Sequence, residues 1–117
     1  MSAAPVVSGA SRANGSVEVL AASGGRLEVK GALTFATARK ARQQGLRLLE
    51  QSSSGQIEID CGGVTASDSA GLTVLLDWLT AARNAHRSLQ LSHLPEPIRA
   101  VAQLSDVAEI LEAGVRA

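Results

Sequence analysis

The stretch IEIDCGGVTASDSAGLTVLLDWL, residues 57–79, changes its hydrophobic period half-way along. Apolar and charged residues alternate over residues 57–61, which predicts a half-buried β-strand. The leucines between Leu72 and Leu79 follow the i, i+3, i+4, i+7 spacing of an amphipathic helix. The stretch therefore predicts a strand, a short loop, and then the longest helix of the chain, from Asp68 to about His86.

The flanking sequence extends this order. Residues 16–30 alternate on both sides of a Ser-Gly-Gly turn at 23–25, which indicates a β-hairpin. Helical spacing predicts a helix over residues 34–51 that includes Phe35 in its apolar stripe, although Gly45 weakens it by about 1 kcal/mol relative to alanine. A strand is predicted at 88–94, and Pro97 suits the first turn of a last helix. Residues 106–112 fit a short helix or a strand, so the predicted order is β-β-α-β-α-β-α plus a tail.

This order predicts the architecture. Helices between strands imply parallel crossover connections, whereas the opening hairpin is antiparallel. Strands covered on both faces read as continuous apolar runs, but every strand here alternates, with side chains such as Glu28, Glu58 and Asp60 off the core side. We therefore expect a two-layer α/β sandwich: a mixed, mostly parallel sheet of four to five strands, with helices on one face and water on the other.

Length and composition limit the classes of protein. The 117 residues fit one domain over 16–117, and the Ser-, Ala- and Gly-rich residues 1–15 are expected to form a flexible tail. The formal net charge is zero and aromatic residues make up 2%, which argues against nucleic-acid binding and against attachment to anionic lipid. The N-terminus lacks a secretory pattern and no apolar run is long enough to span a membrane, so we expect a cytoplasmic protein.

Signals for catalysis are weak. Neither a dinucleotide-binding nor a P-loop glycine motif occurs, and Gly62-Gly63 is interpreted as a plain turn pair. One cysteine, Cys61, and two histidines, His86 and His93, do not make a structural zinc set, and Cys61 is expected to be a small buried hydrophobe. We therefore expect no enzyme activity, no metal and no cofactor.

The start of the long helix carries the candidate site. Asp68 is suited to cap the helix, and Ser69 at its first position is expected to be exposed, where the helix dipole would tolerate a phosphate. The side opposite the leucines contains small and apolar residues, with Trp78 on its flank. Two interpretations remain open: a neighbouring helix covers Trp78, or Trp78 anchors a protein-docking face.

At these residues the sequence resembles the STAS family, the sulphate-transporter and anti-anti-sigma-factor domains. The family pattern is a strand ending in Asp, here IEID at 57–60, then Asp-Ser/Thr-x-Gly-Leu opening a Leu-rich helix, here DSAGL at 68–72 followed by TVLL at 73–76. LEVKGALT at 27–34 is similar to the entry from the second strand into the first helix of the family, and the resemblance covers about residues 16–112.

The resemblance implies a non-enzymatic docking domain whose fold is that of the STAS family. The sequence looks closer to the small STAS subunits of Mla phospholipid ABC transporters, which dock on the cytoplasmic ATPase and serve lipid transport between the bacterial inner and outer membranes and outer-membrane lipid asymmetry. Such a subunit would reach the inner membrane only through its partner, without inserting into it. The alternative is an antagonist of an anti-sigma factor, switched when a serine kinase phosphorylates Ser69. The expected partner-binding residues are Asp68, Ser69, Ala70, Gly71, Thr73, Val74, Asp77 and Trp78.

Overall fold

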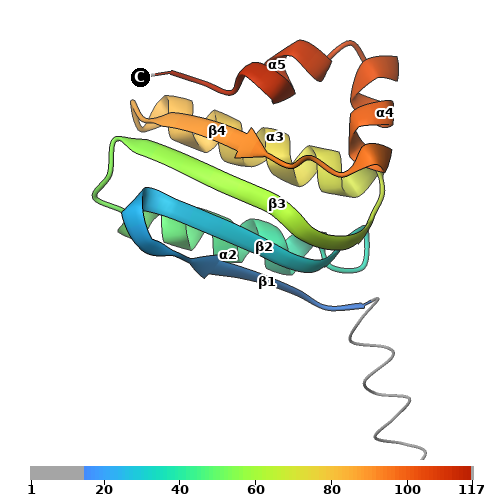
Figure 1. Ribbon diagram of the computed structural model, residues 1–117, viewed down its shortest axis with the longest axis horizontal. Helices are drawn as coiled ribbons and strands as arrows, with labels where there is room; N and C mark the ends of the chain where they lie inside the picture. Colours follow the sequence, from blue (N-terminus) through green and yellow to red (C-terminus); the bar gives the residue numbers. More distant parts are fainter. Residues whose placement is uncertain (1–14, 117) are drawn as a thin grey trace, which may run out of the picture.

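The computed structural model describes residues 15–116, so the tail expected over residues 1–15 lies outside the described part of the chain except for Gly15. Figure 1 shows one sheet with helices packed behind it and two short helices continuing beyond one edge. The elements in chain order are β1 Val17–Ala21, the 3-10 turn η1 Ser23–Gly25, β2 Arg26–Leu33, α2 Ala38–Gln51, β3 Gln56–Ser67, α3 Ser69–Asn84, β4 Ser88–Ser92, α4 Glu96–Leu104 and α5 Ala108–Ala113.

The strands lie in the order β1-β2-β3-β4, which is also their order along the chain. β1 pairs with β2 in antiparallel fashion, whereas β2, β3 and β4 are parallel. Two right-handed crossovers that step in the same direction across a sheet place both of their helices on the same face. Accordingly, α2 and α3 lie side by side behind the sheet in Figure 1, which confirms the predicted two-layer α/β fold.

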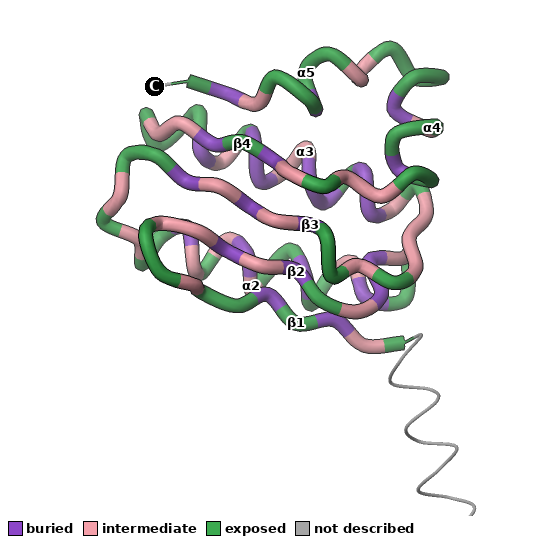
Figure 2. Tube along the Cα trace, in the orientation of Figure 1, coloured by how far each residue is buried: buried purple, intermediate pink, exposed green. Residues whose placement is uncertain are grey.

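The two faces of the sheet differ as the alternation predicted. Ile57, Ile59 and Cys61 on β3 are buried under the helices, whereas Glu58 and Asp60 lie on the uncovered face. Figure 2 shows the same alternation along the central strands as successive buried and less buried segments. The hydrophobic core therefore lies entirely between the sheet and the helical layer.

Three predicted details are corrected by the structure. The helix α2 begins at Ala38 rather than at residue 34, and Phe35 lies in the preceding turn with 85% of its surface exposed. The pair Gly62-Gly63 is part of β3 rather than a turn, because β3 carries an extra residue relative to β2 between the pairs Glu28–Asp60 and Lys30–Gly63. A Cβ at Gly63 would lie 2.9 Å from the carbonyl oxygen of Val29, so this irregular stretch needs glycine.

The C-terminal tail resolves the alternative that the sequence left open. Residues 108–113 form the helix α5, and the chain then returns to the sheet, where Val115 pairs with Leu89 on the outer edge of β4. This single antiparallel bridge stands where a fifth strand would be. Leu89 and Val115 exchange two backbone hydrogen bonds of 2.9 Å.

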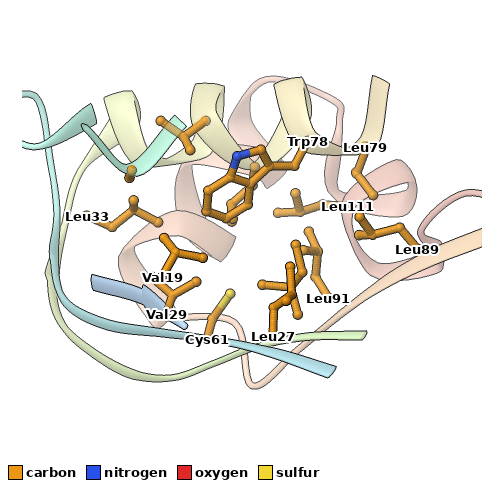
Figure 3. Packing of buried hydrophobic residues seen from close by; sticks show 14 of the residues in the cluster. Val19, Leu27, Val29, Leu33, Cys61, Trp78, Leu79, Leu89, Leu91 and Leu111 are labelled. Carbon is orange, nitrogen blue, oxygen red and sulfur yellow. The ribbon is translucent and has the colours of Figure 1, made fainter. Parts of the chain in front are cut away.

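The contact between α2 and α3 is set by Gly45 and Trp78. Trp78 is fully buried, and Figure 3 shows its indole ring among the core side chains beneath α3. A Cβ at Gly45 would lie 2.2 Å from Cε2 of this ring, so only glycine leaves room for it. The indole nitrogen donates a hydrogen bond of 3.3 Å to the carbonyl oxygen of Arg42. Gly45 is thus required for packing, although it lowers the intrinsic helix propensity of α2.

Candidate interaction site at the start of α3

Asp68 joins the first turn of α3 to the segment that leads into α2. Its backbone is extended, and its Oδ1 accepts a hydrogen bond of 2.9 Å from the N–H of Ala70, which confirms the predicted N-cap. Its Oδ2 accepts a second hydrogen bond of 3.0 Å from the N–H of Phe35. One carboxylate therefore fixes the positions of two segments that are 33 residues apart in the sequence.

The outward side of α3 begins at Ser69 and is lined by short side chains. Ser69, Thr73 and Thr80 are exposed, while Leu76 and Asp77 are partly exposed. These positions lie within about 100° of one another on a helix with 3.6 residues per turn, so they share one face. We call this set, Ser69, Thr73, Leu76, Asp77 and Thr80, the α3 docking face.

Five of the expected partner-binding residues do not lie on this face, and three of the five are buried. Val74 and Trp78 are 2% and 0% exposed, because α2 covers that flank of α3, so the expectation that they face outward is wrong. Gly71 is buried against the sheet, where an added Cβ would lie 2.5 Å from the carbonyl oxygen of Leu33. Asp68 and Ala70 remain partly accessible beside the α3 docking face.

The seam between α2 and α3 is closed at the surface by an ion pair. Nε of Arg42 lies 3.0 Å from Oδ2 of Asp77, and about half of the Arg42 side chain is exposed. This ion pair shows that Arg42 on α2 lies level with Asp77 on α3. Nearer the N-termini of the two helices, the hydrogen bond from Phe35 to Asp68 connects the segments that precede them. The surface beside Ser69 and Thr73 is therefore formed by the first turns of both helices.

Three surface residues of this region were not predicted from the sequence: Leu76, Thr80 and Phe35. The hydroxyl residues Ser69, Thr73 and Thr80 repeat along one side of the helix, and this polar spacing was the signal that could have located the true outward face. No comparable signal existed for Phe35, because its apolar side chain fitted the period of the following helix.

A polar cluster on the uncovered face of the sheet surrounds Asp60. Its carboxylate accepts hydrogen bonds from the backbone N–H of Gly62 at 2.8 Å and from Arg26 at 2.5 Å, and it lies 2.9 Å from Nδ1 of His93. The hydrogen bond from Gly62, followed by those from Arg26 and His93, lowers the pKa of Asp60 to about 2, against the opposing effect of desolvation. The carboxylate thereby links β3 to β2 through Arg26 and to the segment after β4 through His93.

Other candidate chemical groups offer little reactivity. Cys61 is buried, and desolvation raises the pKa of its thiol to about 12, so the nucleophilic thiolate is scarce at neutral pH. Within residues 15–116, no three His, Cys, Asp or Glu side chains are grouped so that they could hold a metal ion. In the same part of the chain no helix has the length and hydropathy needed to cross a bilayer.

Comparison with known proteins identifies the family. A family model described as "Mlab, STAS domain" matches residues 16–112, which is most of the chain. The chain belongs to the STAS domain family. STAS domains are protein-interaction and regulatory modules, and this general role agrees with a surface that presents short side chains on a rigid helix. No curated protein matches the sequence of this STAS domain.

Two solved structures share the fold. The anti-sigma factor antagonist SpoIIAA in its unphosphorylated form superposes with a TM-score of 0.57 at 14% identity, covering 76% of this STAS domain and 83% of SpoIIAA. The murine anion transporter Slc26a9 in its inward-facing state gives a TM-score of 0.52 at 16% identity and covers 92% of this chain. This chain spans only 20% of the Slc26a9 chain. At these identities the likeness concerns the fold alone.

Proposed function

We propose that this STAS domain is a non-enzymatic subunit that docks on the ATPase of an Mla-type phospholipid ABC transporter and regulates it. The observation that carries the proposal is the combination of the family description with an accessible helix face that starts at a hydroxyl residue, Ser69. The subunit would act in the cytoplasm at the inner membrane, held there by its partner.

The α3 docking face suits this role physically. Its side chains are short, so the backbone of a partner can approach the helix closely, and few rotamers are lost on binding. The helix cannot shift easily, because Trp78 locks it against α2 and Asp68 fixes its first turn. A rigid, preformed surface reduces the entropic cost of association.

Binding to the purified ATPase subunit from the same organism tests the proposal. The double variant Ser69→Arg/Thr73→Arg places two long cations on the α3 docking face, and we expect the dissociation constant to rise about 100-fold or more. Gln103→Arg, at an exposed position on α4, is the matched control and should bind as the wild type does. Equal binding by the folded double variant, or no binding by the wild type, would contradict the proposal.

A second candidate is favoured by the exposure of Ser69 at the first position of α3. In this alternative the domain is an anti-sigma factor antagonist, and a serine kinase phosphorylates Ser69 to switch its binding. A phosphate there would lie at the positive end of the helix dipole. Incubation with serine kinases of the same organism, followed by mass spectrometry of the peptide around residue 69, decides this, with Ser69→Ala as the control. An unmodified Ser69 would count against the alternative.

A further inference from the structure

The side chains of three exposed residues where the chain enters α2 form no part of the core. Phe35 is 85% exposed in the turn before the helix, and Arg39 and Lys40 are exposed in its first turn. We call these three residues the α2 entry patch. A single exposed apolar residue is ordinary, but this one stands directly before two cations and beside Asp68.

Arg39 and Lys40 lie at the end of α2 where positive charges destabilise a helix. The N-terminal end of a helix carries a partial positive charge, so basic side chains there are unfavourable, and α2 has no acidic residue in its first turn to offset them. Neither Arg39 nor Lys40 lies in an ion pair with a residue of the described range 15–116. The fold therefore gains no ion pair from these charges, which leaves both side chains available for contacts outside the domain.

The α2 entry patch continues the α3 docking face. The N–H of Phe35 donates to Asp68, the residue directly before Ser69. Further along the seam Arg42 pairs with Asp77. Arg39 lies three residues before Arg42, on the same side of α2, and therefore runs alongside the turn of α3 that contains Thr73. Phe35 and Arg39 thus border the hydroxyl residues of the α3 docking face. Lys40 lies farther round the start of α2, on the side of Gln44, whose amide reaches β1.

We propose that the α2 entry patch selects the partner by binding an apolar pocket rimmed with acidic side chains, Phe35 entering the pocket and Arg39 and Lys40 pairing with its rim. This inference rests on the proposed function and specifies the chemistry of the ATPase surface. Aromatic anchors surrounded by polar groups are typical of binding hot spots. An anionic membrane is a poorer fit, because lipid-binding clusters contain roughly four to eight basic residues and the formal net charge of this chain is zero.

Kinetic measurement of binding to the purified ATPase over a range of salt concentrations tests the inference. Arg39→Glu/Lys40→Glu should slow association about tenfold at low salt and flatten its salt dependence, because steering by opposite charges is lost. Phe35→Ala should raise the dissociation rate about tenfold or more. Arg47→Glu removes another exposed cation of α2, two turns away from the patch, and should leave both rates near the wild-type values.

The patch variants should fold as the wild type does. Glutamates in the first turn of a helix stabilise the helix, and Phe35 makes little contact with the core. If Ser69→Arg/Thr73→Arg abolishes binding while the patch variants bind normally, the inference is wrong and the proposed function stands. If the wild type does not bind the ATPase, both fail. If Arg39→Glu/Lys40→Glu instead loses only sedimentation with vesicles of one part phosphatidylglycerol to three parts phosphatidylcholine, the patch binds lipid and the inference is overturned.

Discussion

Gly45 on α2 leaves the space that the indole ring of Trp78 on α3 fills, and this contact determines which side of α3 reaches solvent. The ring approaches so closely that a methyl group at position 45 would overlap it, with 2.2 Å to Cε2. Because the largest side chain of α3 is held under α2, the helix is rotated about its own axis from the orientation that its leucines alone suggest. The accessible face is therefore the one that carries Ser69 and Thr73.

Replacement of Gly45 by alanine should destabilise the domain. In an exposed helix this change adds about 1 kcal/mol of stability, but here the added methyl group must displace a buried ring, and we expect a net loss of about 1–3 kcal/mol. Urea unfolding measures it. Combining the change with Trp78→Leu should cost less than the sum of the two single changes, because the smaller side chain removes the overlap. Additive costs would show that the two residues do not oppose each other in this way.

The fluorescence of Trp78, the only tryptophan of the chain, should report a buried indole. We expect a blue-shifted emission maximum, weak quenching by iodide, and no change when a partner binds the α3 docking face. A red-shifted emission from the native domain would instead show that the indole ring of Trp78 is exposed to solvent. Trp78→Ala should remove about 3–5 kcal/mol of stability through the cavity that it leaves.

Substitutions at the neighbouring residues Asp68 and Ser69 should have different effects on the free energy of unfolding. Asp68→Ala removes the acceptor for the N–H groups of Ala70 and Phe35, and we expect a loss of about 1–2 kcal/mol in the free energy of unfolding. Ser69→Ala at the neighbouring exposed position should change stability by less than about 0.5 kcal/mol. Thermal or urea unfolding of both variants measures the difference. Equal losses would mean that the Asp68 carboxylate does not tie the two segments together.

Acid should weaken the domain through Asp60. The pKa of Asp60 is lowered in the folded state from 3.8 to about 2. The ionised carboxylate therefore stabilises the folded state fully above about pH 4, and this stabilisation is lost as the pH falls from about 4 to about 2. Asp60→Asn should therefore be less stable than the wild type by on the order of 1–2 kcal/mol at pH 6 and approach it near pH 2. Glu109→Gln, at an exposed position on α5, serves as the control, and a constant difference across this pH range would contradict the assignment.

Much of the fold follows from local pattern. The period of two over residues 57–61 placed Ile57 and Ile59 inward and Asp60 outward, and the structure agrees. The alternation of every strand was enough to expect helices on one face only, because a strand covered on both sides has no place for charged residues. The cap at Asp68 could also be predicted, since a carboxylate before a helix meets free backbone N–H groups.

The orientation of α3 could not be predicted in the same way. The leucines indicate which side of α3 faces the sheet. However, α3 also packs against α2 on one flank and α4 on the other, and the local sequence pattern does not predict these contacts between helices. Val74 and Trp78 were consequently placed outward. The role of Gly45 was hidden for the same reason: a glycine within a helix looks like a weak point until the ring that needs its space is known.

Each border of the sheet is blocked against a further strand at one position. On β4 the segment around Val115 takes up the backbone groups of Leu89, and on β1 the amide side chain of Gln44 accepts the N–H of Val19 at 3.0 Å. Open strand borders invite pairing between molecules and aggregation. Blocking these positions hinders extension of the sheet into a second molecule, which leaves side chains as the means of choosing a neighbour, and single substitutions can alter them.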